Sequence, residues 1–306
     1  MLDLTRRALF KFCAAAAFGR AADLLEIERI TGGTRNSETH VRHYRVRAIV
    51  TLLGVPLFTK DNVGGACAMV EQSGGFSAIQ FVSGSWPEKL RGFNRYGMVQ
   101  EAVRRDAGAA VESAYFSFMT SSAEKNLDQA KKSYLERGSQ QPVSVARGHA
   151  KPAAYASALD HLTLPAKYTW MDCPRLRSEM KDKLSPAKEA SGGDRNGAYL
   201  PFLHSVQAAF AQGAGASERS FVHNAKIYKL RTKITQEGDA LHMAAKIVEP
   251  GSSQEGDFRV WYKPADATGL PQRFEFRPKS FLHLSFELDP AVAGPQFSSL
   301  IAQEQA

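Results

Sequence analysis

The sequence predicts an α+β fold that is mainly antiparallel β: a curved open sheet, or half-barrel, with helices covering or plugging its concave face. Apolar and charged residues alternate with period two along five short segments of the last third of the chain. The links between those segments are too short for crossover helices, so neighbouring strands run antiparallel. A composition of 43% hydrophobic and 23% charged residues over 306 residues is typical of a globular protein with a sizeable core.

The chain begins with a segment that has the layout of an export signal. A basic stretch, Thr5–Lys11, precedes a short apolar run, Phe12–Gly19. The pair Arg6 and Arg7 indicates twin-arginine export; ordinary secretion and an amphipathic first helix of a cytosolic protein are the alternatives. We expect residues 1–22 to be removed and the mature protein to lie in the periplasm or cell envelope.

Much of the net charge of +8 belongs to this segment, because its removal takes away four cations and one anion and leaves +5. That balance suits an anionic envelope surface, but it does not indicate nucleic-acid binding. No apolar run reaches the roughly 18–20 residues that cross a bilayer, so we expect no transmembrane span in the mature chain.

The mature chain keeps two cysteines, Cys67 and Cys173. In an oxidising compartment they form a disulfide, worth about 4–5 kcal/mol of stability, or stay separate as buried apolar thiols. The sequence leaves both possibilities open, because it does not fix the distance between the two Cα atoms.

The first half of the chain predicts a loose lead-in and then strands. Residues 23–42 form the lead-in. From His43 the alternation of Tyr44, Val46 and Val50 with polar residues predicts a strand, which Gly54-Val55-Pro56 interrupts as a bend or bulge. Two further strands are expected at 66–71 and 77–83, joined by a hairpin turn at 72–75.

The middle region, at about residues 85–220, predicts mainly helices. They are expected at 123–134 after a Ser121–Glu124 capping box, at 172–184 after the N-cap Asp172, and at 202–210 before Gly213. Strands are expected in this region only at 142–150 and 159–164.

The last third is the clearest, and residues 43–288 are expected to form one domain before a flexible tail, 289–306. The expected strands are Tyr228–Ile234, Leu241–Ile247, Phe258–Tyr262, Phe274–Phe276 and Leu282–Leu288. Their apolar side chains point to one face, where they form a dry core or line a ligand site. The candidate lining residues are Tyr44, Val46, Val50, Tyr228, Leu230, Phe258, Val260, Tyr262, Phe274, Phe276, Leu284 and Phe286.

The opposite face of these strands is cationic. Its residues either bind lipid headgroups or a partner's acidic patch, or form a solvated face with cross-strand pairs to Glu275 and Glu287. They are Lys229, Arg231, Lys233, Arg259, Lys263, Arg273 and Arg277.

Three segments carry a resemblance: Val46–Leu57, Phe258–Tyr262 and Gly269–Phe276. Together they resemble the uncharacterised exported bacterial family called domain of unknown function 3108, which is similar in fold to periplasmic lipoprotein carriers of the LolA and LolB type. The acidic loop of that family corresponds here to Asp266. The resemblance covers residues 43–83 and 221–288 and implies no catalytic residue.

No Cys-x-x-Cys, His-Glu-x-x-His, Gly-x-Ser-x-Gly or phosphate-binding glycine loop is present. We therefore expect no enzyme, no cofactor and no metal. The favoured function is a periplasmic binding or carrier module for a lipid-like ligand or hydrophobic small molecule. The alternatives are a non-catalytic envelope protein with a dry core, which binds another envelope protein, and an unrecognised hydrolase or metal-dependent enzyme built from dispersed residues.

Overall fold

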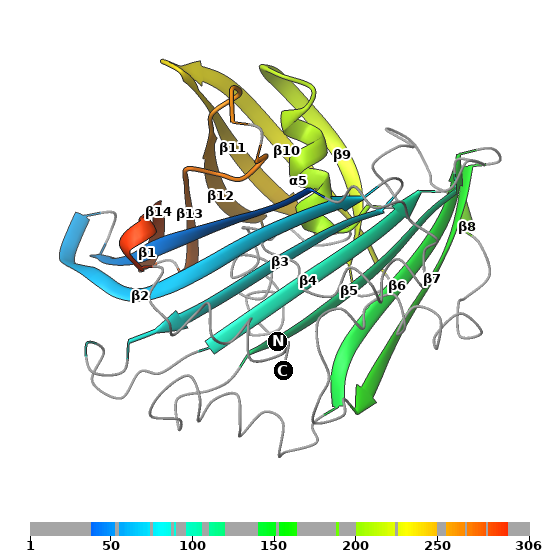
Figure 1. Ribbon diagram of the computed structural model, residues 1–306, viewed down its shortest axis with the longest axis horizontal. Helices are drawn as coiled ribbons and strands as arrows, with labels where there is room; N and C mark the ends of the chain where they lie inside the picture. Colours follow the sequence, from blue (N-terminus) through cyan, green and yellow to red (C-terminus); the bar gives the residue numbers. More distant parts are fainter. Residues whose placement is uncertain are drawn as a thin grey trace.

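The described strands of this protein form one antiparallel sheet. A computed structural model describes residues 38–52, 55–73, 76–86, 89, 96–105, 110–119, 140–150, 153–163, 188–189, 200–223, 226–249, 255–266, 268–279 and 281–292. The sheet has 14 strands in the order β8-β7-β6-β5-β4-β3-β2-β1-β14-β13-β12-β11-β10-β9 (Figure 1). Because β8 and β9 lie at its two edges, the sheet is open, as the sequence predicts.

The N-terminal half of the sheet is a meander that starts in its middle and runs outward. Its strands are β1 Glu38–Leu52, β2 Val55–Ser73, β3 Phe76–Ser85, β4 Tyr96–Arg105, β5 Ala110–Met119, β6 Gln140–Ala150, β7 Ala153–Thr163 and β8 Lys188–Glu189.

The C-terminal half starts at the opposite edge and returns to the middle. Its strands are β9 Gly215–His223, β10 Lys226–Glu237, β11 Ala240–Val248, β12 Glu255–Tyr262, β13 Arg273–Lys279 and β14 Leu282–Leu288, followed by a 3₁₀ turn, Pro290–Val292. The pairing of β14 with β1, from Tyr44 opposite Leu288 to Val50 opposite Leu282, joins the two halves. The five strands predicted in the last third are confirmed, and β9 is an addition.

One described helix, α5 (Phe202–Phe210), packs on the concave face. The predicted helix at this position is confirmed, and the turn that follows it uses Gly213 at φ +79°, where a side chain would be strained. The helix contacts β9 and β10 on one side and β4 on the other. These strands are far apart in the sheet, so the sheet curves around the helix (Figure 1).

The core joins the two halves through aromatic side chains. The ring of Phe274 (β13) lies 5.4 Å from Tyr44 (β1), 5.6 Å from Phe81 (β3) and 4.3 Å from Phe286 (β14) between centroids. On α5, Phe202 lies 5.4 Å from Phe258. A single continuous cluster therefore stabilises both halves of the sheet.

Two predictions near β1 are corrected. The first strand begins at Glu38, so residues 38–42 belong to the sheet and not to the predicted lead-in. The segment at Val55-Pro56 is not a bend within one strand: Leu52 pairs with Val55, so the chain reverses there into the separate strand β2. The β2–β3 hairpin after Ser73 is confirmed by its pairing with Phe76.

The largest correction concerns the middle region predicted to be mainly helical, which contains β4 and β5 where no strand was expected. In β4, Val99, Glu101, Ala102 and Val103 are all buried. A strand buried on both faces loses the polar–apolar alternation by which strands are recognised.

Several predictions fall outside the described residues: the export signal with Arg6 and Arg7, the helices at 123–134 and 172–184, Cys173, and the tail beyond Val292. Among the helices of the described residues, none is long and apolar enough to cross a membrane. The domain boundaries stay a prediction.

Candidate functional site

The predicted ligand-lining residues lie together in the core. Ten of the twelve belong to the buried cluster, and Leu284 packs against it, while Val50 is half-buried at the end of β1. The concave face is covered there by α5, since Phe202 packs against Phe258 and Phe210 lies 4.0 Å from Tyr262 between ring centroids. In the described part of this face, these side chains contact one another, and their ligand-lining role stays a prediction.

Two of these residues, Tyr44 and Tyr262, are tyrosines whose side chains are shielded from water. Burial raises the pKa of Tyr44 and of Tyr262 well above the usual value. The hydroxyl of Tyr44 donates a hydrogen bond of 2.8 Å to the carbonyl oxygen of Pro271. The core thus fixes the loop between β12 and β13.

Asp266, the acidic-loop residue of the family resemblance, has a structural role in this loop. It forms an ion pair with Arg42 of β1 and accepts a hydrogen bond of 2.6 Å from the Thr268 hydroxyl. Arg42 also donates to the carbonyl oxygen of Leu270 at 2.6 Å. These contacts attach the β12–β13 loop to β1.

Among the described residues Cys67 is a buried thiol without a disulfide partner, and burial raises its pKa to about 12. Its predicted partner, Cys173, lies outside the described residues, so the disulfide stays a prediction.

The outer face of β10–β14 carries the cations that the sequence places opposite the core. Exposed and buried residues alternate strictly in β10 from Tyr228 to Ile234, so Lys229, Arg231 and Lys233 all point outward. The sheet register aligns these residues into cross-strand rows, in which each outward side chain neighbours the one directly opposite it.

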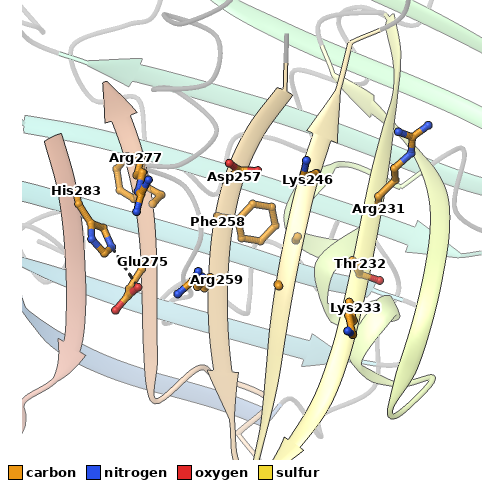
Figure 2. Close-up of a pocket in the computed structure, with 13 residues that line it drawn as sticks. Arg231, Thr232, Lys233, Lys246, Asp257, Phe258, Arg259, Glu275, Arg277 and His283 are labelled. Atoms are coloured by element: carbon orange, nitrogen blue, oxygen red, sulfur yellow. Dashed lines mark hydrogen bonds and ion pairs between the residues drawn. The ribbon is translucent and has the colours of Figure 1, made fainter. Parts of the chain in front are cut away.

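The centre of this face is a hollow around a small residue, Ala244. In the register, Ala244 lies opposite Lys233 of β10 and opposite Arg259 of β12, and Lys246 follows it on the same face of β11. Because the long side chains surround a methyl group, they leave a cavity of about 460 Å³ open to solvent. We call this cavity the cationic hollow. Figure 2 shows its ionisable lining residues, which project from neighbouring strands: Arg231, Lys233, Lys246, Asp257, Arg259, Glu275, Arg277 and His283.

The acidic side chains of the hollow offset its positive charge only in part. Five Lys or Arg residues line it against two carboxylates, Asp257 and Glu275. Glu275 already pairs with Arg273, outside the hollow, and with His283 at 3.1 Å. Burial alone raises the pKa of Glu275, but the hydrogen bond from His283 and the charge of Arg273 outweigh burial and hold the pKa below its ordinary value.

One cation of the hollow is paired at its edge, since Arg231 donates to Glu218 of β9 at 2.8 Å. Within the part of the chain that the structure describes, Lys233, Arg259 and Arg277 are exposed and form no ion pair or hydrogen bond through their side chains. An anion that enters the hollow meets these three groups without having to break an existing pair.

One end of the hollow adjoins an exposed apolar surface. Arg277 and His283 lie on the two sides of the β13–β14 turn, which carries Phe281, 53% exposed. The amide of Thr51 donates to the carbonyl oxygen of Phe281 at 2.8 Å, which joins this turn to the β1–β2 hairpin. We call the exposed side chains of the two hairpins the apolar tip: Leu52, Val55, Leu57, Phe58 and Phe281, between 53% and 64% exposed.

Sequence reasoning found some of these residues and missed others. It identified Arg231, Lys233, Arg259 and Arg277 as cations of a polar face, but not Lys246 or His283. Lys246 carries the same signal, since it alternates with Ala245 and Ile247. The importance of Ala244 and the clustering of the apolar tip depend on the register and on which hairpins adjoin, which the sequence does not reveal.

No family model matches the chain, and no curated protein matches it. Among solved structures, it is similar to one described as a β-barrel-like protein of domain of unknown function DUF1849 from Brucella abortus. That likeness has a TM-score of 0.47 at 9% identity and covers 82% of this chain and 95% of that chain. The neighbour is itself of unknown function, and the likeness concerns only the fold.

Proposed function

We propose that this protein is an exported binding module of the cell envelope that docks on an anionic lipid surface. In this proposal the cationic hollow takes phosphate-bearing headgroups, and the apolar tip enters the acyl-chain boundary. The observation that carries the proposal is the cluster of Lys233, Arg259 and Arg277, which are cationic, exposed and unpaired among the described residues. This cationic cluster lies beside the apolar tip. A surface that docks on a membrane is expected to combine cations for the lipid headgroups with apolar side chains for the acyl-chain boundary.

The size and charge of the hollow support this ligand class. A cavity of about 460 Å³ falls in the range of small-molecule sites, about 300–1,000 Å³, and accommodates a headgroup. Lys and Arg side chains near an anionic bilayer contribute about 1 kcal/mol each. Side chains of the size of leucine and phenylalanine favour burial by about 1.5–3 kcal/mol each, so both surfaces contribute to binding.

The sequence favoured a different location for a lipid-like ligand, the concave face, by resemblance to domain of unknown function 3108 and to LolA- and LolB-type carriers. At Phe258 and Tyr262 that face is covered by α5, so a ligand at these two residues has to displace the helix. The outer hollow requires no such rearrangement. We therefore place the lipid contact on the outer face and keep export to the periplasm as part of the same proposal.

The test is co-sedimentation of the purified protein with vesicles of phosphatidylglycerol and of phosphatidylcholine. We expect binding to the anionic vesicles that weakens as salt rises, because exposed charges are screened. The double variant Lys233→Gln/Arg259→Gln should lose most of this binding. The matched control is Lys263→Gln. This exposed lysine directly follows β12 and pairs with Asp239 at 2.6 Å, outside the hollow.

The apolar tip is tested separately with Leu57→Ser/Phe58→Ser, which should weaken binding even at low salt. Inorganic phosphate distinguishes a lipid site from a site for a free anion: phosphate that competes fully, with no effect of the tip variant, indicates a soluble anion. Equal binding of the wild-type protein to both vesicle types, or to neither, contradicts the proposal.

A further inference from the structure

Three polar side chains from distant parts of the sequence meet on the face opposite the cationic hollow. Nε2 of His204 (α5) lies 3.1 Å from the hydroxyl oxygen of Ser77 (β3), and Nδ1 of the same ring lies 3.1 Å from Oε2 of Glu101 (β4). A serine, a histidine and a carboxylate linked in this order form the arrangement of a nucleophile, a general base and a residue that orients the base.

The sheet register explains why Ser77 and Glu101 lie together. Ser77 pairs with Val103, and Ile79 pairs with Glu101. Ser77 and Ile79 are two residues apart on β3, and Glu101 and Val103 are two residues apart on β4. All four side chains therefore lie on the same face of the sheet, which makes Ser77 the diagonal neighbour of Glu101. The first turn of α5 places His204 over this pair.

Glu101 holds the histidine in two ways. Pro201 provides no side-chain cap for α5, and the carboxylate of Glu101 replaces it: it accepts the amide N–H of Leu203 at 2.9 Å and that of His204 at 3.2 Å. Because both oxygens accept hydrogen bonds, Nδ1 of His204 is the donor to Oε2. In the neutral ring Nε2 is then unprotonated and accepts the proton of the Ser77 hydroxyl.

The exposure of the three side chains increases from Glu101 to Ser77, as catalysis requires, because the nucleophile has to reach the substrate. Glu101 is 0% and His204 is 6% exposed, whereas Ser77 is half-buried. The nucleophile is therefore the accessible member, and the residues behind it are shielded from water. Besides Glu101 and His204, the neighbours of Ser77 on this face are the apolar side chains of Ile79 and Val103, 0% and 3% exposed, which favours an uncharged acyl group.

We propose that Ser77, His204 and Glu101 hydrolyse carboxylic esters with an apolar acyl chain. The Oγ of Ser77 forms a bond to the carbonyl carbon while its proton passes to Nε2 of His204. The ester C–O bond breaks, and the same proton leaves with the alkoxide as an alcohol.

A water molecule then attacks the acyl-serine. It gives one proton to Nε2, the bond from the acyl carbon to Oγ breaks, and that proton returns to Oγ. The products are the carboxylic acid and free Ser77, so the sum of the steps is ester plus water giving acid plus alcohol. Glu101 acts as a positioning residue, since the hydrogen bonds that the structure describes for its carboxylate run to His204 and to the start of α5. This activity is independent of lipid docking.

The test uses the full chain with a fluorophosphonate probe and with p-nitrophenyl butyrate. We expect one covalent adduct, mapped by mass spectrometry to Ser77, and ester hydrolysis that Ser77→Ala abolishes. The matched control is Ser217→Ala, because the Ser217 hydroxyl bonds Thr232 at 2.8 Å and, within the described part of the chain, no histidine. This variant should keep both labelling and hydrolysis.

Glu101→Gln tests the positioning role, because its amide oxygen can still accept an N–H at the start of α5. We expect kcat to fall by about 10²–10⁴-fold with little change in KM, and the acid limb of the pH–rate profile to shift. A capping network without chemistry predicts no labelling at all. Folded wild-type protein that takes no label at Ser77, or hydrolysis that Ser77→Ala leaves unchanged, overturns the proposal.

Discussion

The two halves of the sheet bury their strands differently. In β10 every second side chain is exposed, from Lys229 to Lys233. In β2 every residue from Val63 to Glu71 is buried, on both faces of the strand. The C-terminal half therefore presents one wet face, whereas this stretch of β2 in the N-terminal half presents none.

This difference has a consequence for the polar residues of each half. A polar group on the wet face keeps water or an exposed ion pair, as Arg231 does with Glu218. A polar group on a doubly buried strand needs a partner inside the protein or shifts its protonation. Glu101 finds that partner in α5, whereas neither carboxylate oxygen of Glu71 accepts a hydrogen bond from the residues that the structure describes.

The largest expected effect comes from the aromatic core that joins the halves. Phe274→Ala removes the ring that contacts Tyr44, Phe81 and Phe286, and we expect a loss of about 3–5 kcal/mol of stability. Urea unfolding followed by tryptophan fluorescence and by circular dichroism measures it. The two probes should still coincide, and Phe281→Ala at the exposed tip should cost less than about 0.5 kcal/mol. Separate transitions for the two probes would show that the halves unfold independently.

A smaller effect is expected where strands of the doubly buried half approach closely. A Cβ on Gly64 lies 2.3 Å from the carbonyl oxygen of Gly84, a backbone atom. Gly64→Ala should therefore cost about 1–3 kcal/mol through displacement of β2 from β3. As the control, Ala216→Val adds volume on the exposed edge strand β9 and should be nearly neutral. Equal melting temperatures for wild type and Gly64→Ala would contradict the close approach.

Glu71 provides a pH test of the same half. Burial raises its pKa to about 7, so the folded protein holds a proton that the unfolded chain releases above about pH 4.3. Stability is therefore lost as pH rises from about 4.3 through 7. Glu71→Gln should remove this loss and stabilise the protein at pH 8 by about 1–3 kcal/mol, measured by urea unfolding at pH 4 and pH 8.

The contrasting acid in the wet half is Glu218, whose pKa is lowered by hydrogen bonds from Arg231 and Lys229. Its stabilising contribution is present at neutral pH and disappears as pH falls through its folded-state pKa. Glu218→Gln should thus slightly destabilise the protein at pH 8, the opposite sign to Glu71→Gln. If both variants changed the stability at pH 8 in the same direction, the difference in burial between Glu71 and Glu218 would not explain their effects.

The smallest effect is expected at the hollow itself. Arg259 is exposed and has no partner among the described residues, so Arg259→Gln should change the free energy of unfolding by less than about 0.5 kcal/mol. Binding to phosphatidylglycerol vesicles should nevertheless fall. A loss of stability above about 1 kcal/mol would assign Arg259 to the fold and remove it from the binding surface.

The sequence predicted the strands that have one wet face and missed a strand that is buried on both faces. Strands β10–β14 were predicted because their wet face leaves an alternation that can be read directly, as in Tyr228, Leu230 and Thr232. The strand β4 was missed because Glu101, Ala102 and Val103 are buried together and include residue types that also favour helices. For the candidate site, four of the five cations of the hollow were predicted, but Lys246 and the apolar tip were not.

By itself, the sequence determined which residues turn inward and which turn outward in the C-terminal strands, because that choice depends only on local period and hydrophobicity. The tertiary structure decided which outward residues are neighbours. Ala244 became the floor of a cationic hollow only through its register with Lys233 and Arg259. Ser77, Glu101 and His204 met only because the sheet curves around α5. Contacts between residues far apart in the chain depend on register and curvature, which no local pattern encodes.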